Sequence, residues 1–173
     1  MANATARVRI GTTLGAITIE LYGADAPVTV DNFLQYVRAG YYVGTIFHRV
    51  IPGFMVQCGG MEEGMWEKTE GQRAAISNES GNGLTNDVGT IAMARTSDPG
   101  SATSQFFINV RNNGSLNRDR CRDGVGYAVF GRVVDGMDVV HKIERVRTGT
   151  QSGHSDVPVD TIAIVSTEEL LTD

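Results

Sequence analysis

Short runs of alternating polar and apolar residues follow one another through most of the chain, and only two well-separated segments show the periodicity of an amphipathic helix. Residues 7–10 and 16–21 alternate around a Thr-Thr-Leu-Gly turn, which is the pattern of a half-buried β-hairpin. A doubly wound parallel sheet needs a helix at nearly every crossover, so two helices cannot build one. The pattern leaves an antiparallel barrel or a sandwich, and closure of a barrel would remove exposed strand edges.

The first predicted helix spans residues 27–39. Pro27 suits a first helical turn, where its missing N–H has no intrahelical partner, and Asp25 is a candidate cap. The apolar stripe repeats at i, i+3, i+4 and i+7 and stops before Gly40; its members are Val30, Phe33, Leu34 and Val37. A second amphipathic helix is predicted after the turn at 135–136 and ends near residue 145.

Eight strands are predicted, over residues 7–10, 16–21, 45–50, 54–58, 90–94, 105–110, 127–134 and 159–166. Two polar stretches, 59–88 and 111–125, separate some of them and show little periodicity. Long ordered loops in compact domains often carry function, so both loops are candidates for a place near the site.

Size and charge exclude several classes of function. The chain has 173 residues, and we expect a single domain over 1–173. Its formal net charge of −5 disfavours binding to nucleic acid or to an anionic membrane surface. No apolar run approaches a membrane span, and the first residues lack a signal-peptide pattern. We therefore expect a cytoplasmic protein, with a periplasmic or secreted mature form that has lost its leader as the alternative.

The residues that usually mark metal, nucleotide or nucleophile chemistry are not arranged for it. The sequence has no G-x-S-x-G, H-E-x-x-H, Walker or G-x-G-x-x-G motif, and its three histidines lack metal-ligand spacing, so no metal and no cofactor is expected. His48 is interpreted as a satisfied core or edge histidine rather than a catalytic base. Cys58 and Cys121 are interpreted as reduced thiols, although a bridge closing a loop of about 60 residues stays open.

Two segments carry a specific resemblance. Residues 47–57 read Phe-His-Arg-Val-Ile-Pro-Gly-Phe-Met-Val-Gln, and the second segment runs from Met-Ala-Arg at 93–95 to Ser-Gln-Phe-Phe-Ile-Asn at 104–109. Together they resemble the two signature regions of the cyclophilin-type peptidyl-prolyl cis–trans isomerases, and the likeness extends over about residues 7–167. The resemblance implies a mainly β fold, a closed eight-stranded antiparallel β-barrel capped by two α-helices. It also implies a cofactor-free, monomeric enzyme that acts on proline-containing polypeptides and assists their folding.

Arg49 is the residue type that such a reaction needs. The X–Pro peptide bond resists rotation by roughly 18–20 kcal/mol because resonance stiffens its C–N link. In the twisted transition state the prolyl nitrogen gains a localised lone pair, which a permanently charged guanidinium can bind better than it binds either planar isomer. Gln57 is expected to orient Arg49 or to bond the substrate backbone.

The resemblance places the other site residues around a shallow proline pocket. Ala94 and Arg95 would supply main-chain groups to the peptide, and Gln105 a side-chain contact. The family often has Asn where this chain has Arg95, so the added charge is expected to favour acidic flanking residues. Phe107 is assigned to the pocket and Phe106, which faces the other way on an alternating strand, to packing. The predicted apolar walls are Phe54, Met55, Phe107, Leu116 and Tyr127.

Two departures from the family pattern affect ligands. Ser115 stands where many members have the Trp that bonds cyclosporin, so weak or no cyclosporin binding is expected. Cys58 stands where Gly is common, and an oxidised or alkylated thiol there is expected to hinder the groove.

Two other function classes compete with the isomerase. A non-catalytic binding module for proline-containing peptides could use the same groove, but binding alone needs no donor at the prolyl nitrogen, so the Arg49 signature disfavours it. A hydrolase or a nucleic-acid-binding barrel is disfavoured by the missing nucleophile–base pair and by the acidic charge.

Overall fold

The computed structural model describes residues 3–171. The chain forms two α-helices, α1 (Pro27–Arg38) and α2 (Met137–Glu144), and two short 3₁₀ turns, η1 (Ser80–Asn82) and η2 (Gly114–Leu116). The strands are β1 (Ala6–Thr12), β2 (Gly15–Leu21), β3 (Arg49–Ile51), β4 (Met55–Cys58), β5 (Met61–Glu62), β6 (Trp66–Glu67), β7 (Thr90–Met93), β8 (Phe106–Asn109), β9 (Val129–Asp135), β10 (Thr148–Gln151), β11 (His154–Pro158) and β12 (Ile164–Leu170).

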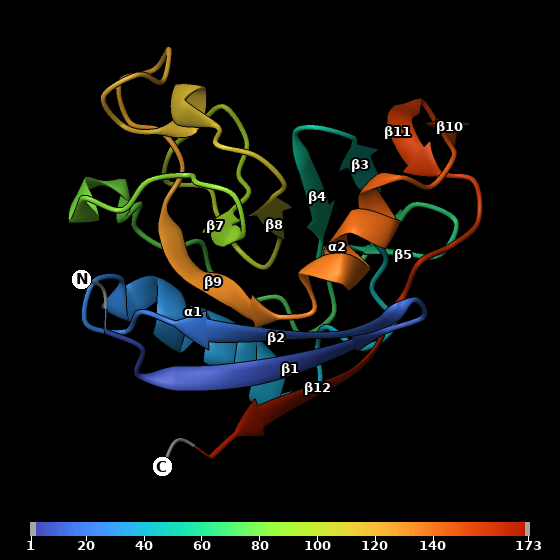
Figure 1. The fold of residues 1–173 in the computed structure, drawn as a ribbon, viewed down its shortest axis with the longest axis horizontal. Helices are drawn as coiled ribbons and strands as arrows, with labels where there is room; N and C mark the ends of the chain where they lie inside the picture. The colour runs from blue at the N-terminus through green and yellow to red at the C-terminus, as the bar shows by residue number, and fades with distance from the viewer. Residues whose placement is uncertain (1–2, 172–173) are drawn as a thin grey trace.

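Eight of these strands form one curled antiparallel sheet in the order β12-β1-β2-β9-β7-β8-β4-β3 (Figure 1). This confirms the predicted mainly β fold of eight strands and two helices, but the prediction of a closed barrel is overstated. The two edge strands, β3 and β12, share no ladder in the described part of the chain. Their flanking segments meet at one isolated bridge between Ile46 and Ala163, where three backbone hydrogen bonds of 2.9 Å join residues 44–47 to residues 162–164. The chain before β3 is irregular rather than extended, so these contacts do not continue as a ladder.

The period-2 alternation divides the sheet into two faces, each with its own apolar cluster. The inner face packs against α1, whose Phe33 ring lies 5.3 Å from both Phe106 and Phe130. The outer face carries a second cluster that contains Met55 and Phe107. Phe106 therefore belongs to the main core and Phe107 does not, as the alternation predicts.

Helix α1 begins at the predicted residue but with a different cap. Asp25 does not cap it, and the first residues of the helix instead donate to Glu79, which is far along the chain. The backbone N–H groups of Val28 and Thr29 lie 3.3 and 2.6 Å from the Glu79 carboxylate, and the Thr29 hydroxyl lies 2.6 Å from it. A carboxylate at a helix N-terminus satisfies unpaired N–H groups and complements the helix dipole.

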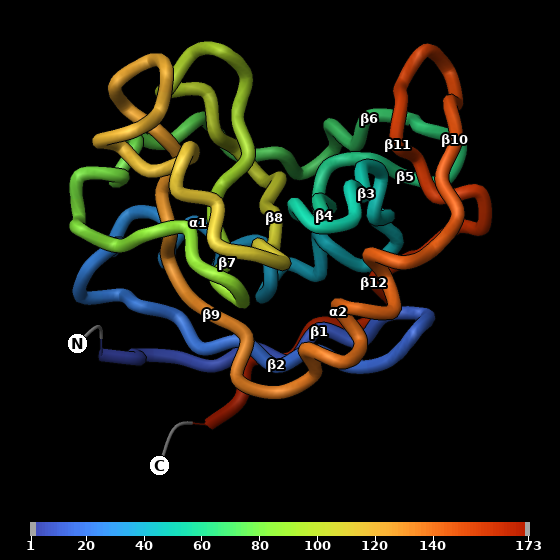
Figure 2. Tube along the Cα trace, turned by 45° about the horizontal axis from the view of Figure 1, so that its top comes forward, coloured from blue at the N-terminus to red at the C-terminus, as the bar shows by residue number. Residues whose placement is uncertain are grey.

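The remaining differences between the prediction and the structure concern the last strand and the loops. The last strand spans 164–170 instead of the predicted 159–166, and two small ribbons, β5–β6 and β10–β11, lie in segments without clear alternation. Ser152 adopts a positive φ of 50° at the tip of the β10–β11 ribbon. That ribbon contacts β3 and stands beside it in Figure 2. Within residues 3–171, neither helix is long and apolar enough to cross a membrane.

Candidate active site

One row of side chains crosses five strands on the outer face of the sheet. Arg49 pairs with Gln57, Gln57 with Phe107, Phe107 with Ala92, and Ala92 with Val129. Directly opposed residues of antiparallel strands project from the same face, so strand register alone places the cation, the amide and the aromatic ring side by side. The row therefore brings together residues from both signature segments.

Nine of the ten predicted site residues line one cavity of about 200 Å³. The lining residues come from β3, β4 and the turn between them, from β8, and from the loops that follow β7 and β8. They are Arg49, Phe54, Met55, Gln57, Ala94, Arg95, Phe107, Leu116 and Tyr127. Gln105, the tenth, lies in an adjoining cavity of about 270 Å³ that shares Gln57, Ala94 and Arg95 with the first.

Arg49 is exposed at the rim of the cavity, and no carboxylate within residues 3–171 forms an ion pair with it. Gln57 lies beside it but does not orient it, because the Gln57 amide donates to the Gln105 side chain at 2.9 Å. The guanidinium of Arg49 therefore remains available to a ligand in the cavity.

The aromatic wall at Phe54 is fixed by its backbone. Gly53 adopts φ +69° in the turn between β3 and β4, and its N–H donates to Glu144 of α2 at 3.0 Å. Phe54 then closes the turn, with its N–H 3.0 Å from the Ile51 carbonyl, while its own carbonyl accepts from the Val110 N–H at 3.1 Å. These hydrogen bonds fix the backbone of Phe54 between β3 and the end of β8.

Arg95 differs from the expectation. Its side chain is only 2% exposed and forms an ion pair with Asp123. The guanidinium also lies over the Tyr127 ring, 4.3 Å from its centroid. The predicted preference for acidic flanking residues is therefore not supported by the structure, since this charge is buried and neutralised within the protein.

Sequence reasoning missed a network of asparagine side chains behind the pocket. Asn113 donates to the Phe54 carbonyl and to Asn109, both at 2.8 Å, and Asn109 donates to Asn86 at 3.0 Å. The Asn117 side-chain carbonyl accepts from the Asn86 backbone at 2.7 Å. The network anchors both sides of η2, which carries Leu116. The four-residue spacing of the asparagines at 109, 113 and 117 is the signal that could have found it.

The structure corrects part of the interpretation of His48 and Cys58, which both lie next to site residues in the sequence. His48 is buried, but its Nδ1 has no partner in the described structure, so the ring is not satisfied. Burial lowers the pKa of His48 to about 4; the Ile46 backbone opposes this shift, and His154 and Arg49 add smaller effects that lower the pKa further. Cys58 points into the main core, and burial raises the pKa of its thiol well above the usual range. Its thiol therefore does not reach the groove, and both cysteines are free.

Comparison with known proteins places this geometry in a family. Residues 7–169 match the family described as cyclophilin type peptidyl-prolyl cis-trans isomerase/CLD. The chain belongs to the cyclophilin family. It is 54% identical over 164 residues to peptidyl-prolyl cis-trans isomerase cyp18 of Streptomyces antibioticus, covering 94% of this chain and 98% of that protein. It is 52% identical over 160 residues to peptidyl-prolyl cis-trans isomerase B of Escherichia coli (strain K12), covering 92% and 96%.

Solved structures agree with this cyclophilin across nearly its whole length. A cyclophilin type peptidyl-prolyl cis-trans isomerase of Cryptosporidium parvum superposes with a TM-score of 0.79 at 27% identity, covering 97% of this chain and 99% of the other. A second crystal structure from that organism, determined in the presence of the dipeptide Ala-Pro, gives a TM-score of 0.78 at 28% identity, with coverage of 96% and 99%.

Proposed function

We propose that this cyclophilin catalyses rotation about X–Pro peptide bonds of polypeptides, and that Arg49 donates a charge-assisted hydrogen bond to the prolyl nitrogen of the twisted transition state. The supporting observation is an exposed guanidinium, with no ion pair within residues 3–171, beside a small cavity whose walls include Phe54, Met55 and Phe107, and in register with Gln57 and Phe107. A proline ring fits such a cavity, and a fixed donor aimed at the nitrogen binds the twisted state preferentially.

The size of the required effect is consistent with this arrangement. Spontaneous isomerisation takes tens of seconds or longer. Reaching ~10³ per second requires about five decades, or ~7 kcal/mol of selective stabilisation. A charge-assisted hydrogen bond at a partly dry site can supply several kcal/mol of this, and the grip of the pocket on the ring and flanking backbone supplies the rest.

Polypeptide substrates are favoured because the rim of the pocket offers unused backbone groups. Neither the N–H nor the C=O of Arg95 has a hydrogen-bond partner within residues 3–171. An extended peptide can pair with such groups while its proline enters the cavity. The cyclophilin from Cryptosporidium parvum that was solved in the presence of Ala-Pro supports the same substrate class.

The test of Arg49 is a peptide isomerisation assay. Arg49→Ala should lower kcat by about 100-fold, because a charge-assisted contact to the transition state is worth about 3 kcal/mol. Arg9→Ala removes another exposed arginine, one that pairs with Glu168 on a distant strand pair, and should leave the rate unchanged. A loss below about threefold in Arg49→Ala would contradict the role proposed for this residue. Unchanged peptide binding with no isomerisation by the native chain would favour the non-catalytic binding module.

Further proposals concern ligands and cellular setting. Ser115 lies exposed on η2 and offers no indole N–H, so we propose that cyclosporin binds weakly; a nanomolar Kd by calorimetry would contradict this. We propose that the chain is a monomer, as the family resemblance implies. We also propose a cytoplasmic location, which fits the two free thiols. Sedimentation and localisation of the full chain would test these two points.

A further inference from the structure

The loop between Leu116 and Tyr127 begins and ends at the proline pocket. Both residues line the cavity, and the Tyr127 N–H donates to the Leu116 carbonyl at 3.0 Å. Gly126 closes the loop with φ +75°, and a Cβ at this position would lie 2.6 Å from the Leu116 carbonyl oxygen. The position of two pocket walls therefore depends on what holds this loop in place.

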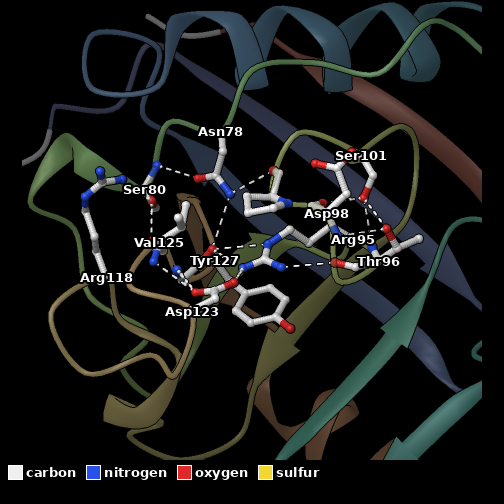
Figure 3. A network of polar contacts seen from close by, with 12 residues as sticks. Asn78, Ser80, Arg95, Thr96, Asp98, Ser101, Arg118, Asp123, Val125 and Tyr127 are labelled. Atoms are coloured by element: carbon white, nitrogen blue, oxygen red, sulfur yellow. Dashed lines mark hydrogen bonds and ion pairs between the residues drawn. The ribbon is translucent and has the colours of Figure 1, made fainter.

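The side chain of Arg95 holds this loop through a network of polar contacts (Figure 3). Nε and Nη2 both donate to the Gly126 carbonyl, at 3.2 and 2.9 Å, and Nη2 also donates to Asp123 at 2.5 Å. Nη1 donates to the Thr96 carbonyl at 3.0 Å. The contacts engage all three nitrogens and use four of the five N–H donors, and only 2% of the side chain is exposed, so this guanidinium is committed to the protein rather than to a substrate.

Asp123 completes the attachment from the loop side. One carboxylate oxygen accepts the Val125 and Gly126 N–H groups at 2.9 and 3.0 Å, and the other accepts Arg95. The Gly126 and Val125 N–H groups, followed by Arg95, hold the pKa of the Asp123 carboxyl far below its usual range. The carboxylate is therefore charged throughout the neutral range. The Arg95–Asp123 ion pair, which we call the staple, therefore persists over this range.

The ring of Tyr127 lies between this staple and the pocket. Its centroid is 4.3 Å from the Arg95 guanidinium carbon and 5.8 Å from the Phe107 centroid, with the two rings at 77°. A cation over one ring and an edge-to-face contact with the next each favour a single orientation. Arg95 thus packs against one wall of the pocket that it also helps to line.

We propose that Arg95 and Asp123 are positioning residues that preset the Tyr127 and Leu116 walls for the proline ring. This inference rests on the proposed function, because it assumes that the cavity receives proline. A wall that is already ordered does not lose conformational freedom when the ligand binds, so presetting it strengthens binding. The wall touches the ring in both planar isomers and in the twisted state, so its loss should raise KM and leave kcat nearly unchanged.

A double-mutant cycle on peptide kinetics tests the proposal. Arg95→Gln should raise KM about tenfold and Asp123→Asn about threefold, with kcat within about twofold of the native value in both. Tyr127→Ala removes the wall that Arg95 touches directly and leaves the Leu116 wall in place. In that background the effect of Arg95→Gln on KM should fall from about tenfold to less than about threefold, since the two substitutions share most of one structural cause. Independent, multiplying effects of Arg95→Gln and Tyr127→Ala on KM would overturn the proposal.

Two further measurements separate positioning from general stability. Arg132→Gln breaks another arginine–carboxylate pair, with Glu20 at 2.8 Å on distant strands, and should leave KM unchanged. The ¹³C ring resonances of Tyr127, assigned through Tyr127→Phe, should broaden or shift in Asp123→Asn; unchanged resonances with unchanged KM would refute the staple. If Arg95→Gln does not fold, the cycle is run with Asp123→Asn. The proposed function fails by a different result, peptide binding without isomerisation by the native chain, and the role of Arg49 fails by an unaltered kcat in Arg49→Ala.

Discussion

Arg49 and His48 are adjacent in the sequence, but they occupy opposite environments. Arg49 is exposed at the cavity, whereas His48 is buried with an unpartnered Nδ1. His48 lies in the irregular segment before β3, and Arg49 is the first residue of that strand. A charge useful for catalysis therefore sits next to a ring that must stay neutral. Protonation of the His48 ring therefore lowers the free energy of unfolding.

His48 should make the fold less stable as the pH falls from 7 to 5. Its pKa is about 4 in the folded chain, where burial is the main cause, and near 6.5 in the unfolded chain. Between these values the unfolded state binds the proton more readily, so stability falls with pH. The contribution of His48 should reach about 2 kcal/mol lost between pH 7 and pH 5.

Urea unfolding of the native chain and of His48→Gln at both pH values measures this contribution. The variant should lose most of the difference between pH 7 and pH 5. His154→Gln, which changes an exposed histidine of β11, is the matched control and should keep that difference. Equal pH dependence in the native chain and His48→Gln would show that other groups cause it.

At the scale of elements, α1 is held by a residue 50 positions further along the chain. The Glu79 carboxylate binds the N–H of Thr29 and its hydroxyl, and Thr29 is fully buried. Glu79→Ala leaves these groups without an acceptor and should cost about 1–3 kcal/mol of unfolding free energy. Glu70→Ala changes an exposed carboxylate in the same loop and should alter stability by less than about 0.5 kcal/mol. Thermal denaturation of both variants decides whether the cap contributes.

The placement of Phe107 could be predicted from the sequence, whereas the contact between Glu79 and helix α1 could not. Alternation along a single strand is a local pattern, so it separates Phe107 from Phe106 and places Gln57 on the face of Met55. The partners of Glu79 and Arg95 lie 50 and 28 residues away. The two carboxylates, Glu79 and Asp123, lie in segments without periodicity. No local pattern specifies such a pair. A loop carboxylate therefore could not be assigned to a helix end, nor Arg95 to a buried staple.

At the scale of the whole molecule, the site and the main core use opposite faces of one sheet. The inner cluster contains Phe33 and Phe106, and the outer cluster contains Met55 and Phe107. The family resemblance could predict most of the pocket, because strand register carries residues of both signature segments into one row. It could not predict how the eight-stranded sheet meets at its edges, since residues 45–48 have the pattern of a strand but lie outside β3, with Thr45 and Ile46 only in isolated bridges.

The proposed mechanism predicts that turnover hardly depends on pH between about 6 and 9, because it uses no group that titrates in this range. Arg49 remains charged throughout this range, and the other pocket side chains proposed to act, Gln57, Phe54 and Phe107, do not titrate. His48 is the nearest histidine in sequence, and with a pKa of about 4 it is neutral throughout the window. kcat/KM for a peptide without titratable flanking groups should vary by less than about twofold across the window. Peptide controls without enzyme correct for the spontaneous rate. A bell-shaped profile would reveal an acid–base group in the reaction, and Arg49 could then no longer be the main source of transition-state stabilisation.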